Sequence, residues 1–181
     1  MSKIVEEVNR HTIAVLVDNE AGVLARVIGL FSGRGYNIES LTVDEVDSAA
    51  NLSRITIVSR GTQVILDQIA AQLGRLMPVR KVVNLTEQGR SIECVVALIK
   101  IVGNAAMRAK ATAIAENAAA RVVDTTGDAM VVQMCGEPGV VDRVIDQLRP
   151  CGLTEIARSG SLAIGCGDAV LEATAAARQS A

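Results

Sequence analysis

Two short stretches near the start of the chain combine polar residues and glycines in a pattern that could bind a small anion. The first is residues 18–22 (Asp-Asn-Glu-Ala-Gly), directly before an apolar stretch with helical spacing. The first turn of a helix exposes unpaired N–H groups and carries partial positive charge, so it suits a carboxylate. Gly22 has no Cβ to keep a ligand from the backbone, and Asn19 can hydrogen-bond to a ligand or to the turn. An ordinary turn with an N-cap explains the same residues.

The second stretch is residues 34–41, where a predicted helix end runs into a predicted strand. Asn37 stands at the strand start and offers both a donor and an acceptor to the carboxylate and ammonium groups of an amino acid. The alternative is that Gly35 and Asn37 only form the turn. A third residue, Arg54, lies within an apolar strand, where it either contacts a partner or sits on an exposed face.

The other reactive residue types do not form a recognisable motif. The chain has a single histidine, His11, and four cysteines without a C-x-x-C pair: Cys94, Cys135, Cys151 and Cys166. This spacing does not match a structural zinc site and favours small, reduced side chains. One histidine also limits acid–base chemistry near neutral pH.

Composition narrows the possible function classes. The 181 residues are 50% hydrophobic but only 1% aromatic, so the cores must be aliphatic. Few aromatics and a net charge of -2 argue against a nucleic-acid-binding protein. No apolar run reaches roughly 18 residues and the start does not resemble a signal peptide, so we expect a cytoplasmic protein with no membrane partner.

The chain contains two copies of one pattern. Gly61 follows a short apolar run. At 6, 11 and 12 residues after this glycine the chain has Asp67, Gln72 and Leu73. The same offsets recur later in the chain with Gly136, Asp142, Gln147 and Leu148. Each copy predicts a strand, a glycine-marked turn and an amphipathic helix.

The surrounding residues extend each copy to the order β-α-β-β-α-β. In the first half we expect strands at 11–17, 37–46, 52–59 and 79–86, with helices starting at residues 23 and 63. In the second half we expect strands at 92–102, 121–126, 129–135 and 153–158, with helices at 104–118 and 140–148. The predicted fold class is therefore α+β, with two tandem ferredoxin-like units. The predicted domains are an extension (1–10), a first domain (11–87), a linker (88–91), a second domain (92–167) and an Ala-rich tail (168–181), either loose or a frayed helix.

Two helices can cover only one face of each sheet. The predicted sheet-facing positions are apolar, for example Val15, Val43, Ile57 and Val83. Since a second copy of the chain is the simplest cover for the remaining face, we expect at least a homodimer.

Residues 19–27, 29–41 and 52–57 resemble the small regulatory subunit of acetohydroxyacid synthase, also called acetolactate synthase. That family's long signature, close to N-E-S/A-G-x-L-x-R-V-x-G-L-F-x-x-R-G-Y-N-I-E-S-L, is met at nearly every position. Residues 11–87 look like the family's amino-acid-sensing ACT domain and 92–165 like its C-terminal domain. The chain departs from the family in the Ala-rich helix 104–118 and in residues 165–167. The resemblance therefore does not predict which contacts the second domain makes.

The resemblance implies a regulatory subunit with no catalytic residues and no cofactor or metal of its own. The family's large catalytic subunit carries thiamine diphosphate, magnesium and FAD and makes acetolactate from pyruvate. The small subunit activates it and confers feedback inhibition by a branched-chain amino acid, usually valine. In the family this effector binds between ACT domains of two chains. One side would be lined by Asn19, Gly22, Val23 and Leu24, and the neighbouring chain would supply Asn37 and Ile38.

Two other classes of function fit the predicted fold less well. A small acylphosphatase-like hydrolase needs an arginine-bearing anion loop after the first strand, where this chain has Asp18 and Glu20. A stand-alone ACT regulator of another enzyme or of transcription is the second class. A transcription factor would need a basic recognition helix, which the sequence does not indicate.

Overall fold

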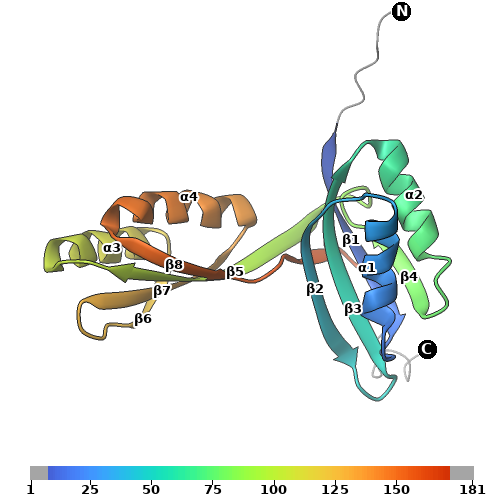
Figure 1. The fold of residues 1–181 in the computed structure, drawn as a ribbon, viewed down its shortest axis with the longest axis horizontal. Helices are drawn as coiled ribbons and strands as arrows, with labels where there is room; N and C mark the ends of the chain where they lie inside the picture. Colours follow the sequence, from blue (N-terminus) through green and yellow to red (C-terminus); the bar gives the residue numbers. More distant parts are fainter. Residues whose placement is uncertain (1–7, 172–181) are drawn as a thin grey trace, which may run out of the picture. The chain divides into compact units, whose positions relative to one another are not determined.

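The computed structural model describes residues 8–171, and Figure 1 shows their fold. Contacts divide the chain into two compact units. Unit 1 contains residues up to Ile92 together with those from Ala163 onward, and unit 2 is Glu93–Leu162. Each unit has an antiparallel sheet and two main helices, which confirms the predicted α+β fold with two β-α-β-β-α-β units. None of the helices within the described residues is long and apolar enough to cross a membrane.

Unit 1 contains four strands in the spatial order β2-β3-β1-β4. The elements in chain order are β1 (Asn9–Asp18), α1 (Val23–Gly33), β2 (Ile38–Asp47), β3 (Leu52–Gly61), α2 (Gln63–Leu73) and β4 (Val79–Asn84). Strand β2 is therefore an edge strand, paired on one side with β3.

The core of unit 1 follows from the alternation of side chains along β1. Ile13, Val15 and Val17 point to one face, where they pack with Phe31 of α1 and Leu66 of α2. All five are nearly inaccessible to solvent. The core is aliphatic apart from Phe31, as the composition predicts.

Unit 2 repeats the arrangement with the strand order β6-β7-β5-β8. Its elements are β5 (Ser91–Val102), which starts in unit 1, α3 (Ala105–Asn117), β6 (Arg121–Asp124), β7 (Ala129–Gly136), α4 (Pro138–Leu148), a short 3-10 helix (Arg149–Cys151) and β8 (Leu153–Arg158).

Local signals in the sequence fix the ends of the helices in unit 2. The Asn104 side chain accepts a hydrogen bond from the Met107 amide at 3.0 Å, and Glu137 caps α4 through the Gly139 amide at 3.1 Å. Gly152 follows the 3-10 helix with φ 87°, and a Cβ there would lie 2.3 Å from the Val102 carbonyl oxygen. Only glycine fits that position.

After β8 the chain returns to unit 1, a feature that no local pattern in the sequence indicates. A further strand, β9 (Leu162–Gly165), pairs with β5, and the Cys166 amide donates to the Arg90 carbonyl at 2.9 Å. Unit 2 therefore ends at Leu162, earlier than the predicted range 92–167. Of the predicted tail, residues 168–171 belong to unit 1, and the remainder lies outside the described residues.

The returning segment covers part of the sheet face that lies opposite the helices. Ala163 packs there against Ala14, Val83 and Leu85, and Leu171 packs against the same cluster. The chain thus supplies part of this cover itself, and a second copy as the cover of the remainder stays a prediction. Of the apolar sheet positions named from the sequence, Val15 and Ile57 belong to the core under the helices. Val43 is 45% exposed.

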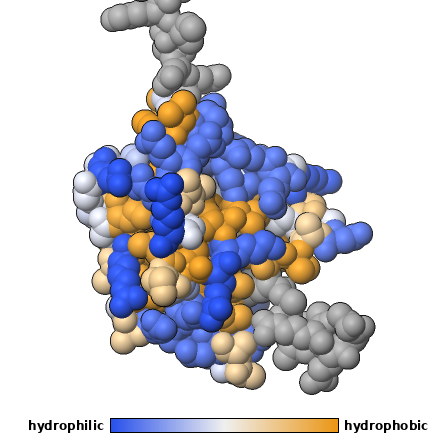
Figure 2. Space-filling model, turned by 90° about the vertical axis from the view of Figure 1, so that its right-hand side faces the viewer, coloured by the Kyte–Doolittle hydropathy of each residue, from blue (hydrophilic) through white to orange (hydrophobic). Residues whose placement is uncertain are grey.

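Apolar surface nevertheless remains on unit 1. Figure 2 shows apolar side chains gathered in the middle of one face, with hydrophilic residues around them. The exposed large apolar side chains of unit 1 include Ile28 on α1, Val43 and Val46 on β2, and Val64 on α2.

Candidate functional site

The turn between β1 and α1 depends on the backbone conformation of Gly22. This residue caps α1 with φ 84° and ψ 0°, in the left-handed region that side chains with a Cβ rarely adopt. The Glu20 amide donates to the Asp18 carbonyl at 2.9 Å, and the Val23 amide donates to the Glu20 carbonyl at 3.2 Å. A Cβ built on Gly22 would meet no atom within 4 Å. Gly22 therefore shapes the turn and leaves open space beside it.

The first turn of α1 presents unsatisfied backbone donors. The helical ladder begins with the Arg26 amide, which donates to the Gly22 carbonyl at 3.1 Å. Among the described residues, no backbone carbonyl accepts from the amides of Leu24 and Ala25, and no side chain caps the helix. The first turn contains no acidic residue either. Two N–H groups at the positive end of a helix suit a carboxylate.

Cations offset the negative charge of the turn. The Asp18 carboxylate accepts from Arg80 Nε at 2.7 Å, and Glu20 lies 4.0 Å from Arg26 Nη1. Pairing reduces the repulsion that these two carboxylates would exert on a bound anion.

The backbone of Asn19 is held while its side chain is exposed. Its amide donates to the Asn51 carbonyl at 2.7 Å, and its own carbonyl accepts from Asn51 Nδ2 at 3.2 Å. The Asn19 side-chain amide lies 3.5 Å from Glu45 Oε2 on β2, at the outer limit of a hydrogen bond. The side chain can therefore exchange this weak contact for a ligand.

The apolar residues of the predicted site lie between the turn and the core. Val23 is 7% exposed and belongs to the core, so it anchors the start of α1 to the sheet. Leu24 is half-buried and packs against that core.

Asn37 and Ile38 lie where α1 has ended and β2 begins. The Asn37 carbonyl accepts from Ser59 Oγ at 2.7 Å, and its side chain is exposed. Ile38 is opposite Ser59 in the sheet and packs against the core. The structure therefore fixes the backbone of Asn37 and leaves its side-chain amide accessible.

One chain does not bring the two predicted groups of residues together. The turn at Asn19 adjoins Leu52 of β3, because Asp18 pairs with Leu52, whereas Ile38 pairs with Ser59. Seven residues along β3 separate these points, roughly 23 Å at 3.3 Å per residue. A ligand the size of an amino acid can contact only one of the two groups within a single chain.

Arg54 lies on the sheet face opposite the helices, in register with Leu16 of β1 and Asp44 of β2. Its Nη2 donates to the Ala163 carbonyl at 2.6 Å. The structure thus gives Arg54 an acceptor in the same chain, and the suggested contact with a partner stays a prediction.

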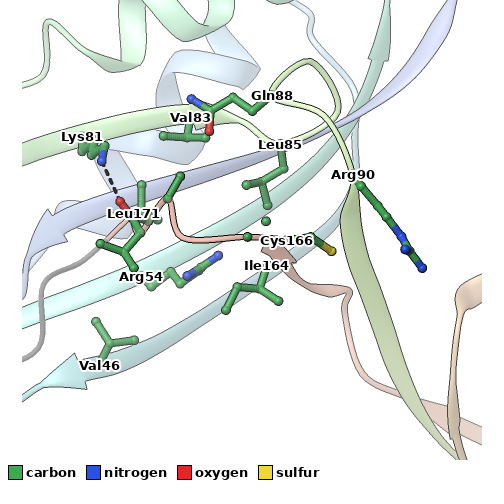
Figure 3. A pocket seen from close by; sticks show the side chains of 14 residues that line it. Val46, Arg54, Lys81, Val83, Leu85, Gln88, Arg90, Ile164, Cys166 and Leu171 are labelled. Carbon is green, nitrogen blue, oxygen red and sulfur yellow. Dashed lines mark hydrogen bonds between the residues drawn. The ribbon is translucent and has the colours of Figure 1, made fainter.

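The same face of unit 1 contains a cavity of about 520 Å³ beneath the returning segment (Figure 3). Its side chains include three cations and no carboxylate. Lys81 Nζ donates to the Val170 carbonyl at 2.9 Å, whereas Arg90 points away from the other labelled side chains. The lining residues are Val46, Arg54, Lys81, Val83, Leu85, Gln88, Arg90, Ile164, Gly165, Cys166, Gly167, Ala169, Val170 and Leu171. Sequence reasoning missed this cavity because it exists only through the return of residues 163–171.

Within residues 8–171, no group of three or more His, Cys, Asp or Glu side chains is placed to hold a metal ion.

Each half of the chain matches the model of a known protein family. Residues 13–81 match the model described as an AHAS small subunit-like ACT domain, and residues 95–167 match the model for the small subunit of acetolactate synthase. Unit 1 thus has the ACT class of domain that its fold and its helix-start turn indicate.

Whole-chain relatives agree with these matches. The chain is 40% identical over 159 residues to a probable acetolactate synthase small subunit of Archaeoglobus fulgidus, covering 88% of this chain and 98% of that protein. It is 39% identical over 163 residues to the acetolactate synthase isozyme 3 small subunit of Escherichia coli, covering 90% and 99%. The crystal structure of an acetolactate synthase small subunit from Thermotoga maritima superposes with a TM-score of 0.81 at 28% identity, covering 89% of this chain and 99% of that one. The chain belongs to the family of acetolactate synthase small subunits.

Proposed function

We propose that this chain is the regulatory subunit of an acetolactate synthase. It activates the catalytic large subunit and transmits feedback inhibition by a branched-chain amino acid, with valine the first candidate. The observation that carries the proposal is the α1 turn. It offers two unsatisfied amides, at Leu24 and Ala25, beside the open space at Gly22, in a chain of this family.

The edge strand β2 supports a site shared by two chains. Within the described sheet β2 has a neighbouring strand on one side, β3, and such an edge strand can pair with a strand of another chain. If two copies paired antiparallel through β2, the start of one strand would meet the end of the other. Asn37 of one copy would then approach residues 45–47 of its neighbour, where Asn19 contacts Glu45. This arrangement would also bury Val43 and Val46, which are 45% and 39% exposed.

In such a dimer each group has a defined task. The effector's carboxylate binds the Leu24 and Ala25 amides, the side-chain amide of Asn37 from the other copy contacts its polar groups, and Ile38 and Leu24 contact its aliphatic side chain. Regulation requires the amino acid to favour one of two states of the complex, with a coupling free energy of about 1–3 kcal/mol.

The proposal assigns the chemistry to the large subunit. That subunit would bind thiamine diphosphate, magnesium and FAD, while this chain supplies effector binding and contacts to its partner. We place the complex in the cytoplasm.

Calorimetric titration with valine, leucine and isoleucine tests the effector proposal. We expect saturable binding of at least one of them to the full-length chain, with a stoichiometry set by the dimer. A pull-down tests the partner: a captured acetolactate synthase large subunit supports the proposal. Capture of an unrelated enzyme instead would favour the stand-alone ACT regulator. No binding of any of the three amino acids would contradict the effector role.

A further inference from the structure

Two thiols in unit 2 lie in contact on neighbouring strands. Cys94 Sγ on β5 and Cys135 Sγ on β7 are 3.0 Å apart. Val96 pairs directly with Cys135, and Cys94 lies two residues before Val96, so both cysteines point to the same side of the sheet. The buried core residues Val95 and Ala97 point to the opposite side. The thiol pair therefore lies on the sheet face away from α3 and α4.

Exposure distinguishes this pair from Cys151, and its place in unit 2 distinguishes it from Cys166. Cys135 is exposed and Cys94 is half-buried, so a reagent in solution can reach the pair. Cys151 is fully buried in the core of unit 2, and Cys166 belongs to unit 1. All four are free thiols in the structure.

We propose that Cys94 and Cys135 form a redox modification site, which a low-molecular-weight disulfide such as oxidised glutathione converts into an intramolecular disulfide. The sulfurs need to approach by about 1 Å to reach the bonded distance of about 2.05 Å. They lie on a diagonal of the ladder near the end of β7 at Gly136, where β7 no longer constrains the chain that follows.

The reaction proceeds by two thiol–disulfide exchanges. The Cys135 thiolate attacks one sulfur of oxidised glutathione, which breaks its S–S bond, forms a mixed disulfide and releases one glutathione. The Cys94 thiolate then attacks Cys135 Sγ, which forms the Cys94–Cys135 bond and releases the second glutathione. The two protons from the protein thiols end on the two glutathione thiols. Two protein thiols are thereby oxidised and one glutathione disulfide is reduced.

The environment of each sulfur sets this order. The hydrogen bond between the two thiols, together with burial, raises the pKa of Cys94 above its ordinary value. Cys94 is therefore less often the thiolate that starts the exchange. Cys135, which is exposed, reacts first, and Cys94 resolves the mixed disulfide from contact distance.

The disulfide would close a covalent loop within unit 2. The two cysteines are 41 residues apart in the sequence, and the loop contains α3 and β6. A cross-link of this span restricts the unfolded chain, so oxidation should raise the melting temperature of unit 2 by roughly 10–30 °C.

The test equilibrates the full-length chain with defined ratios of oxidised to reduced glutathione and maps its cysteines by alkylation and mass spectrometry. We expect a Cys94–Cys135 link, a higher melting temperature and reversal of both by dithiothreitol. The Cys94→Ser variant should keep a stable glutathione adduct on Cys135. In the Cys135→Ser variant, oxidised glutathione should modify Cys94 roughly ten-fold more slowly than it modifies Cys135 in the Cys94→Ser variant. Cys166→Ser is the matched control, because it removes another exposed thiol and should leave the link intact.

Three outcomes for the wild-type chain would overturn the proposal. In the first, Cys135 keeps its glutathione adduct while Cys94 stays free. In the second, Cys135 forms its disulfide with Cys166, and in the third, both thiols stay unmodified in excess oxidised glutathione.

Discussion

Gly22→Asp, compared with Gly22→Asn, tests whether the α1 turn binds the carboxylate of the effector. Both side chains have nearly the same shape, and both residue types tolerate the left-handed region better than others do. Their backbone cost at φ 84° is therefore similar. A Cβ at this position meets nothing within 4 Å, so either side chain clears the protein itself. The two variants differ chiefly by one negative charge beside the Leu24 and Ala25 amides.

This added negative charge determines how much weaker we expect valine binding to be. Two like charges about 4 Å apart repel by ~1–4 kcal/mol, depending on the local dielectric. At ~1.4 kcal/mol per decade, Gly22→Asp should bind valine roughly 5-fold to several hundred-fold more weakly than Gly22→Asn. Calorimetry gives the affinities, and inhibition of the reconstituted large subunit by valine gives the functional counterpart.

Several results would refute this reasoning. Equal losses in the two variants would show that steric intrusion or strain, and not charge, weakens binding. If both variants kept wild-type sensitivity to the amino acid, the effector site would lie elsewhere. If both failed to activate the large subunit, Gly22 would be a structural turn residue only.

Four further predictions follow from the site and the sheet. Asn37→Ala would remove the proposed hydrogen bond to the charged effector and should weaken valine binding by ~1.5–3 kcal/mol, measured by calorimetry, with activation of the large subunit retained. Val43→Lys, on the exposed part of β2, should convert the proposed dimer to a monomer in light scattering and abolish effector binding, whereas Val64→Lys on α2 should leave both unchanged. Arg54→Met removes the donor to the Ala163 carbonyl and should lower the free energy of unfolding by about 1–3 kcal/mol in urea titrations; an unchanged midpoint would show that this contact is neutral. The chain alone, given pyruvate, thiamine diphosphate, magnesium and FAD, should form no acetolactate, and turnover free of large subunit would contradict the regulatory function.

Local patterns in the sequence predicted most of the two units. The repeat around Gly61 and Gly136 fixed the position of each second helix, and the run before Gly33 predicted α1. These signals are local, because hydrophobic spacing and helix-ending residues act over a few turns of chain. The sequence predicted the turn at Gly22 as an anion-binding site because glycine has no Cβ. The positive φ of Gly22 is a second reason for glycine at this position, and it becomes apparent only in the structure.

Long-range pairings could not be predicted in the same way. Strand β9 is four residues long and has an exposed-buried-exposed pattern too short to indicate a partner, and its contact with Ala14 spans most of the chain. Cys94 and Cys135 show no motif in the sequence because their proximity depends on the register between β5 and β7. The separation of Asn19 from Asn37 likewise becomes apparent only when β3 is placed between them.

The rate of acetolactate formation by a purified large subunit, measured with and without this chain over a range of valine concentrations, tests the central claim most directly. The account predicts that the chain stimulates the large subunit and that valine reverses the stimulation, with the large subunit alone responding far less. A rate that the chain leaves unchanged, or equal inhibition by valine with and without the chain, would contradict it.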